Sequence, residues 1–160
     1  MMGVGKSILG KIVAKQLNLK FIDTDLNIEK KCGMTISQIF KKKGEVFFRK
    51  EEQEEVLKSL KNHNSVIALG GGAFINKLIR DNILKKTTSI WLDLNLKTLN
   101  KRMKWNKRRP LLEVKNTQVK INYLYAERKN IYKLAKHRIN CNDKNKKNLV
   151  KEIINVYEKK

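Results

Sequence analysis

The stretch Gly3-Val4-Gly5-Lys6-Ser7 decides the fold class, because it opens an amphipathic helix and matches the end of the phosphate-binding pattern G-x-x-x-x-G-K-[ST]. In this pattern the backbone N–H groups of the loop and the positive end of the helix hold polyphosphate. Lys6 would reach the β- and γ-phosphates, and the hydroxyl of Ser7 would bind Mg²⁺. A flexible, glycine-containing N-terminus in front of an ordinary helix is the alternative interpretation.

Two parts of the full pattern fall outside the sequence. The first glycine would lie one position before Met1, and so would the strand that leads into such a loop. Without that strand, a central position in a parallel sheet would be empty and the edges of its neighbours would be unpaired. We expect a start site that was placed too far downstream, which upstream sequence encoding an apolar run that ends in glycine would support.

Apolar periodicity beyond the loop alternates helices with short strands. Helices are expected over 7–17, 35–43, 45–61, 76–84, 96–105, 123–136 and 147–157, and strands over 20–23, 66–69, 89–93 and 138–141. This alternation predicts a parallel sheet covered by helices on both faces, a three-layer α/β/α fold. Because ligands bind at the carboxyl ends of such strands, the chemistry is expected at Asp23 and Asp25, at Gly70–Gly72 and at Asp93.

The pair of acids in Asp23-Thr24-Asp25 follows the strand expected over 20–23. In extended chain, two carboxylates one residue apart point the same way. One could help to hold Mg²⁺ through water while the other meets a substrate hydroxyl. A polar loop or a helix N-cap is the alternative.

Arg49 lies in the unusual stretch GEVFFRKEE over 44–52. Two phenylalanines beside it place an always-charged guanidinium against apolar walls, which suits the binding of a carboxylate. The alternatives are that the phenylalanines belong to the core and that Arg49 makes a surface pair with Glu52. The run Gly70–Gly72 allows a backbone to approach a ligand closely, or simply makes a tight turn.

The stretch Arg108-Arg109-Pro110-Leu111-Leu112 contains the only proline and lies in the most basic loop-like segment. Basic loops in phosphoryl-transfer enzymes close over the nucleotide and place an arginine against developing charge. A solvated basic loop is the alternative here. Arg128 lies in a later expected helix, where simple surface exposure is the alternative.

Taken together and in this order, these residues resemble the shikimate kinase family. The motifs MGVGKS, FIDTD, GEVFFRKEE, ALGGGA, RRPLL and ERKNIYKLA occur at compatible spacings along essentially the whole chain. The resemblance implies one P-loop kinase domain over 1–160, with a substrate-binding region at about 25–60 and a lid at about 103–116. It implies the family's five-stranded parallel sheet, with the first strand missing from this chain. It also implies transfer of a phosphoryl group from ATP, with Mg²⁺, to the 3-hydroxyl of shikimate, in the pathway to chorismate and aromatic amino acids.

The resemblance further assigns roles to matching residues. The implied catalytic residues are Lys6, Asp25 and Arg109; the implied metal ligands are Ser7 and Asp23; the implied nucleotide contacts are Gly3, Val4, Gly5, Lys6, Ser7, Ile8, Arg102 and Arg109. The implied substrate contacts are Asp25, Arg49, Gly70, Gly71, Gly72 and Arg128. Arg49 and Arg128 resemble the pair that grips the substrate carboxylate, and Asp25 the acid that binds the hydroxyls and serves as a base. Arg102 resembles the arginine that stacks on adenine.

The sequence departs from the family pattern at Ile8, where the family usually has threonine, and in the lysine-rich stretch 142–148, where no residue is assigned.

A kinase of another small metabolite, of the gluconate or nucleotide type, is the first alternative function. The RRPLL segment and the Arg49/Arg128 pair argue against it. A truncated, inactive paralogue is another alternative.

The formal net charge of +22 raises the hypothesis of a nucleic-acid binder. However, only seven of the 37 basic residues are arginine, and the lysines are spread along the whole chain, which favours a solvated surface. No apolar run approaches the roughly 20 residues that a membrane span needs, no signal peptide is recognisable, and two cysteines are too few for a disulfide framework. We therefore expect a cytoplasmic protein that binds neither membrane nor specific nucleic acid. A monomer is a separate expectation that these observations do not bear on.

Overall fold

The computed structural model describes residues 3–104 and 117–159. Within these residues the chain alternates helices and strands, largely as the periodicity predicts. The elements are α1 (Lys6–Gln16), β1 (Lys20–Asp23), α2 (Thr24–Cys32), α3 (Ile36–Ser59), β2 (Ser65–Ala68), the 3₁₀ turn η1 (Ala73–Ile75), α4 (Lys77–Lys86), β3 (Ile90–Asp93), α5 (Leu96–Lys104), α6 (Thr117–Tyr132), β4 (His137–Asn140) and α7 (Lys146–Glu158).

The strands form two separate parallel pairs. β1 pairs with β2, with Lys20 opposite Ser65, and β3 pairs with β4, with Ile90 opposite His137. No strand in the described part of the chain pairs with the second edge of β2 or of β3. The described strands therefore form two parallel pairs rather than one continuous sheet.

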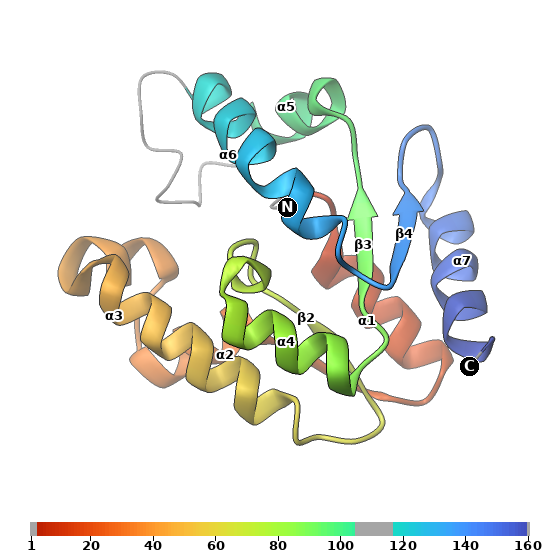
Figure 1. The fold of residues 1–160 in the computed structure, drawn as a ribbon, viewed down its shortest axis with the longest axis horizontal. Coiled ribbons are helices and arrows are strands. Elements are labelled where there is room, and N and C mark those ends of the chain that lie inside the picture. The colour runs from red at the N-terminus through yellow and green to blue at the C-terminus, as the bar shows by residue number, and fades with distance from the viewer. Residues whose placement is uncertain (1–2, 105–116, 160) are drawn as a thin grey trace.

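Helices lie on both sides of the strands. α1 packs against β1, β2 and α7 behind the strands, and α4 lies in front of β2 in the view of Figure 1. The main hydrophobic cluster joins residues from both ends of the chain, including Val4 and Leu9 near the N-terminus and Leu149 near the C-terminus, and it contains Cys141. The three-layer α/β/α prediction is confirmed, with the sheet divided in two.

A second, smaller cluster lies between α2 and α3. Ile28, Ile39 and Phe48 form it, and Cys32 packs against it. The chain bends at Gly44, whose φ of 82° and ψ of 170° are not helical, so that α3 consists of two helical segments. The two helices expected on either side of Gly44 are thereby confirmed, and the bend begins the segment that carries Arg49.

The expectation of an extended Asp23-Thr24-Asp25 is wrong. Asp23 caps a helix that begins at Thr24: its carboxylate accepts a hydrogen bond from the backbone N–H of Leu26 at 3.3 Å. Asp25 therefore lies in the first turn of α2 rather than in extended chain. The carboxylate of Asp23 bonds to Ser7, whereas that of Asp25 lies beside Gly70.

The run Val66–Leu69 is continuously apolar, which is typical of a fully buried strand, but β2 is buried only in part. Val66 and Ile67 in β2 are half-buried, and so are Ile90 and Leu92 in β3. Central strands of parallel sheets are normally covered on both faces and paired at both edges, and here each strand has one open edge.

Most of the lid expected at about 103–116, including Arg109, lies outside the described residues. No described helix combines the length and the apolar character that crossing a membrane requires.

Candidate active site

The loop in front of α1 has the backbone shape of a phosphate cradle. Gly3 and Gly5 have φ of 74° and 101°, in the left-handed region that side chains disfavour. Gly5 is the N-cap of α1 and supplies no side-chain cap, so the first N–H groups of the helix remain directed at whatever lies before it. A helix start of this kind attracts anions. Lys6 is the first residue of that helix.

The two expected metal ligands meet at this loop. The hydroxyl of Ser7 donates a hydrogen bond to Oδ2 of Asp23 at 2.5 Å, which joins the first turn of α1 to the end of β1. Hydroxyl and carboxylate oxygens are the donors that Mg²⁺ prefers. The described residues contain no group of three or more His, Cys, Asp or Glu side chains that could hold a metal. Two oxygen donors beside a phosphate loop fit Mg²⁺, which usually binds through few carboxylates together with water and substrate phosphates.

Arg102 and Ile8 complete the described part of the expected nucleotide site. The guanidinium of Arg102, in α5, donates to the carbonyl of Val4 at 3.3 Å. This contact spans 98 positions of sequence and holds α5 against the phosphate loop. Ile8 lies in the first turn of α1 with 53% of its surface exposed.

Arg49 is held by carboxylates and by aromatic rings. Its Nη1 donates to Oε2 of Glu52 at 2.7 Å, and its Nε and Nη2 donate to Glu45 at 3.1 and 2.9 Å. The guanidinium lies over the rings of Phe48 and Phe40, 5.2 and 5.9 Å from the centroids. One alternative from the sequence is true of Phe48, which is a core residue. The pairing of Arg49 with Glu52 is also observed, but the carboxylate of Glu52 is buried rather than at the surface. The contacts with Phe48 and Glu52 fix the orientation of the Arg49 guanidinium, which is compatible with its binding an anion.

Glu52 is a functional candidate that the sequence did not single out. It is only 2% exposed. Burial raises the pKa of its carboxyl, an effect that the charge of Arg49 opposes and the nearby Asp25 reinforces. The pair of Arg49 and Glu52 is therefore no ordinary surface pair.

The glycine run is required by the side chains that surround it. A Cβ on Gly70 would lie 2.5 Å from Oδ1 of Asp25 and 2.8 Å from Oε1 of Glu52, and a Cβ on Gly72 would lie 2.5 Å from Nη1 of Arg49. Any larger residue would displace these charged groups. The run is therefore more than a tight turn.

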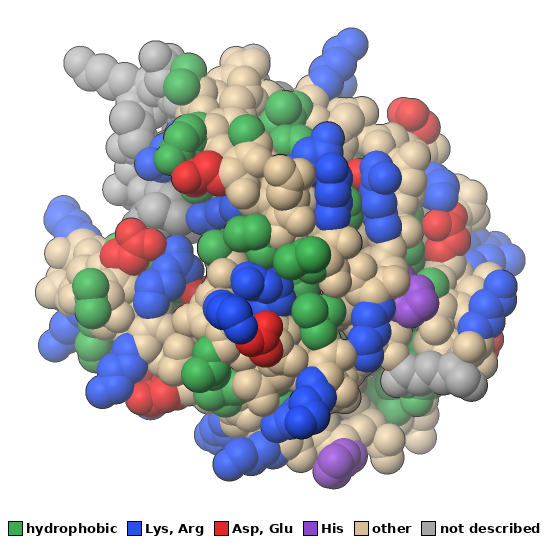
Figure 2. Space-filling view, viewed as in Figure 1, with side chains coloured by type: hydrophobic (Ala, Val, Ile, Leu, Met, Phe, Trp, Pro, Cys, Tyr) green, Lys and Arg blue, Asp and Glu red, His purple; other side chains and the backbone are tan. Residues whose placement is uncertain are grey.

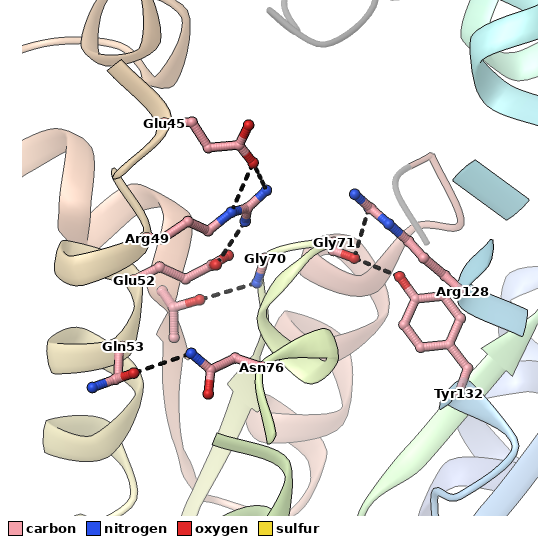
Figure 3. A network of polar contacts seen from close by, with 10 residues as sticks. Glu45, Arg49, Glu52, Gln53, Gly70, Gly71, Asn76, Arg128 and Tyr132 are labelled. Carbon is pink, nitrogen blue, oxygen red and sulfur yellow. Dashed lines mark hydrogen bonds and ion pairs between the residues drawn. The ribbon is translucent and has the colours of Figure 1, made fainter. Parts of the chain in front are cut away.

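Gly71, between them, is held from the other side. Its carbonyl accepts hydrogen bonds from Nη1 of Arg128 at 3.2 Å and from the hydroxyl of Tyr132 at 2.5 Å. Figure 3 shows Arg49 and Arg128 on opposite sides of the turn, one from α3 and the other from α6. Arg128 is 8% exposed, so its interpretation as a surface residue is wrong.

Thr24 ties this turn to the first acids. Its buried hydroxyl donates to the carbonyl of Ala68 at 3.3 Å and accepts from the N–H of Gly70 at 3.1 Å. The end of β2 and the start of α2 are thereby fixed to each other. Asp25, the next residue along the chain, is held beside Gly70 as a result.

Comparison with known proteins shows the family. The shikimate kinase family model matches residues 2–158. The chain belongs to the shikimate kinase family. The shikimate kinase of Sulfurihydrogenibium sp. (strain YO3AOP1) is 44% identical over 154 residues, which cover 96% of this chain and 91% of that protein. The shikimate kinase of Bartonella henselae is 42% identical, over 96% of this chain and 73% of that protein.

Solved shikimate kinases have the same fold. The enzyme from Acinetobacter baumannii, determined in complex with shikimate, superposes with a TM-score of 0.94 at 31% identity, covering 99% of this chain and 89% of that one. The enzyme from Aquifex aeolicus gives a TM-score of 0.86 at 34% identity, covering 99% and 92%. The resemblance to shikimate kinases and the P-loop α/β kinase fold are both confirmed.

The described residues thus bring most of the predicted site together in two groups. Ser7 lies with Asp23 at the phosphate loop, and the glycine run lies among Asp25, Arg49 and Arg128. Three contributors were missed: Thr24, Glu52 and Tyr132. For Tyr132 a signal existed, because residues four apart share a helix face and Tyr132 lies four positions after Arg128.

Proposed function

We propose that this shikimate kinase transfers the γ-phosphoryl group of ATP to the 3-hydroxyl of shikimate through the residues described above, giving shikimate 3-phosphate and ADP. The observation that carries the proposal is the turn Gly70–Gly72, which has Arg49 and Arg128 on its two sides and Asp25 against Gly70. A small anionic triol needs cations at its carboxylate and acceptors at its hydroxyls, and this turn has both. The solved relative that contains shikimate supports the choice of substrate.

The nucleotide half of the site uses the helix start of α1. The backbone N–H groups there and the ammonium of Lys6 bind the phosphates and offset their charge. Ser7 and Asp23 would hold Mg²⁺, which supplies charge neutralisation at the β- and γ-phosphate oxygens. Arg102 keeps the loop in place through the carbonyl of Val4. Arg109 is proposed as the lid arginine that meets the phosphates.

The substrate half orients the acceptor. Arg49 and Arg128 bind the carboxylate of shikimate, and Asp25 accepts a hydrogen bond from the 3-hydroxyl. The hydroxyl oxygen forms the new bond to the γ-phosphorus while the bond from that phosphorus to the bridging oxygen of ADP breaks. The hydroxyl proton passes to the carboxylate of Asp25. The reaction needs little covalent chemistry from the protein, so that positioning and charge supply most of the rate.

We also propose that residues 1–160 form a single domain that acts as a cytoplasmic monomer, without a membrane or specific nucleic-acid partner. The hydrophobic cluster shared by residues near both chain ends supports the single domain. The small cluster between α2 and α3 supports a distinct substrate-binding region at about 25–60. Light scattering in solution tests the oligomeric state.

The direct test is an acceptor panel. ADP release is measured with shikimate, gluconate and nucleoside monophosphates, each with ATP and Mg²⁺. Calorimetry with shikimate alone is run in parallel, so that substrate binding is measured separately from turnover. Turnover with shikimate only is expected. Turnover with another acceptor and no binding of shikimate would contradict the proposal.

A further inference from the structure

The carboxylate of Glu45 pairs with the guanidinium that is proposed to bind the substrate. Its Oε1 accepts hydrogen bonds from both Nε and Nη2 of Arg49, at 3.1 and 2.9 Å. Paired donors on one edge of a guanidinium are what a carboxylate ligand uses in a charge-assisted contact. An acid of the protein itself therefore bonds to two of the donors that the carboxylate of a ligand would use.

The bend in α3 places Glu45 at this edge. With a φ of 82° and a ψ of 170°, Gly44 has a backbone conformation that is essentially restricted to glycine. Among the described residues, a Cβ added to Gly44 would meet no contact within 4 Å. Gly44 therefore serves the path of the chain rather than a close approach. Glu45 is the first residue after the bend, and Arg49 follows one helical turn later.

The two acids that pair with Arg49 differ in burial. The side chain of Glu45 is 57% exposed, whereas that of Glu52 is 2% exposed. The two carboxylates lie on opposite sides of the guanidinium (Figure 3). Breaking a buried pair leaves an uncompensated charge and is costly, but an exposed carboxylate gives up little when water replaces its partner. Glu45 can therefore leave Arg49, while Glu52 stays.

Arg49 remains held at the glycine turn without Glu45. The bond from its Nη1 to Glu52 at 2.7 Å and the ring of Phe48, 5.2 Å from the guanidinium carbon, are separate contacts. The same Nη1 lies against Gly72, where an added Cβ would be 2.5 Å away. The edge that Glu45 releases would then be available to a carboxylate bound at this turn.

We propose that Glu45 is an internal competitor for the substrate carboxylate and thereby sets how tightly Arg49 binds shikimate. In the free protein Glu45 holds the Nε and Nη2 donors, and the carboxylate of shikimate displaces it on binding. Because Glu45 is tethered to the same helix, it competes at a high effective concentration. A ligand then needs further contacts, such as the one proposed at Asp25, to displace it, so that Glu45 disfavours simple carboxylates. This inference rests on the proposed role of Arg49.

The test is Glu45→Gln, which keeps the shape of the side chain and removes its charge. The matched control is Glu54→Gln, because Glu54 is an acid of similar exposure on the same helix that pairs with Lys31 instead. Calorimetry measures the Kd of shikimate and of its methyl ester, which has no carboxylate charge. Glu45→Gln should lower the Kd of shikimate about two- to fivefold, the range expected when an exposed ion pair no longer has to be broken. It should leave the Kd of the ester unchanged, and Glu54→Gln should change neither.

An unchanged or raised Kd of shikimate in Glu45→Gln would overturn the proposal. An equal decrease for the ester, or an equal decrease in Glu54→Gln, would also overturn it, because either result would indicate a general effect of charge or structure. Adding Glu45→Gln to Arg49→Ala should no longer lower the Kd, since the contested donors are gone.

Arg49→Ala alone separates failure of this proposal from failure of the proposed function. If Arg49→Ala weakens the binding of shikimate and Glu45→Gln does not tighten it, only the competition is wrong. If Arg49→Ala binds shikimate as tightly as the unaltered protein, the proposed carboxylate contact is wrong and the competition falls with it.

Discussion

Arg49 shows how one residue combines charge, burial and packing. Its guanidinium is shared between two carboxylates and two aromatic rings. Such a group is already oriented before an anion arrives, which reduces the entropy lost on binding. The sequence predicted the arginine and Phe48 beneath it, but not the contact with Phe40 or the burial of Glu52. Both depend on how α3 folds and packs, which no local pattern shows.

Arg49→Ala should raise the KM for shikimate about tenfold or more and leave the KM for ATP within about twofold, because one charge-assisted contact to the carboxylate is lost. Steady-state kinetics with each substrate varied in turn measures both. Arg138→Ala is the matched control, since Arg138 is an exposed arginine that pairs with Asp93 instead. Equal increases in both KM values would count against the carboxylate contact.

Tyr132 contacts the glycine turn through the backbone carbonyl of Gly71, and we predict that it acts as a positioning residue for the substrate site. Tyr132→Phe removes the hydrogen bond to the carbonyl of Gly71 and should cost about 1 kcal/mol of stability. Because Arg128 donates to the same carbonyl, the KM for shikimate should rise several-fold while kcat changes little.

The control for that variant is Tyr123→Phe, which removes a hydroxyl that is bonded to Glu127 on the exposed surface of the same helix. Thermal unfolding and the KM/kcat split are measured for both variants. A loss of stability with an unchanged KM would reduce Tyr132 to a purely structural role.

At the scale of elements, the turn after β2 is the part most sensitive to size. Gly70→Ala places a methyl group among Asp25 and Glu52, so kcat/KM for shikimate should fall about 100-fold or more while the fold persists. Gly33→Ala is the control, because Gly33 has a φ of 61° but no atom within 4 Å of an added Cβ. That variant should lose about 1 kcal/mol of stability and keep its kcat. Circular dichroism and steady-state rates separate the two effects, and equal losses of activity would contradict this account of the turn.

The boundaries of elements show what local sequence could and could not predict. Most helix and strand positions followed from periodicity, and the helices expected over 35–43 and 45–61 meet at the bend at Gly44. α2 was missed, although Asp23 at its N-cap and the left-handed Gly33 at its C-cap are ordinary helix signals. The two acids were interpreted instead as part of an extended segment that continues β1. The contacts of Gly71 with α6 join residues about 60 positions apart, beyond the reach of any local pattern.

At the scale of the whole molecule, the positive charge is spread over the surface (Figure 2). Figure 2 shows Lys and Arg side chains scattered over the visible face rather than gathered in one band. The electrostatic field of such a distributed positive charge attracts small anions at long range and is screened by salt. Among the described arginines with proposed roles, Arg102 lies at the phosphate loop, and Arg49 and Arg128 lie at the glycine turn.

Binding to duplex DNA should therefore be weak and should be lost by about 0.2 M salt. Fluorescence anisotropy against salt concentration measures it, with kcat/KM for shikimate recorded over the same range. A modest decline of kcat/KM is expected, because both substrates are anions. Tight DNA binding that survives 0.2 M salt would revive the nucleic-acid hypothesis.

The two cysteines give the molecule a pair of built-in reporters. Cys32 packs against the small cluster between α2 and α3, whereas Cys141 is buried in the main cluster just after β4. Burial raises the pKa of the Cys141 thiol to about 11, so this thiol stays protonated and unreactive until its surroundings open. Alkylation rates at the two positions, followed by mass spectrometry, would time the opening of the substrate-binding helices and of the β3–β4 half separately. No label or added probe would have to be engineered into the chain.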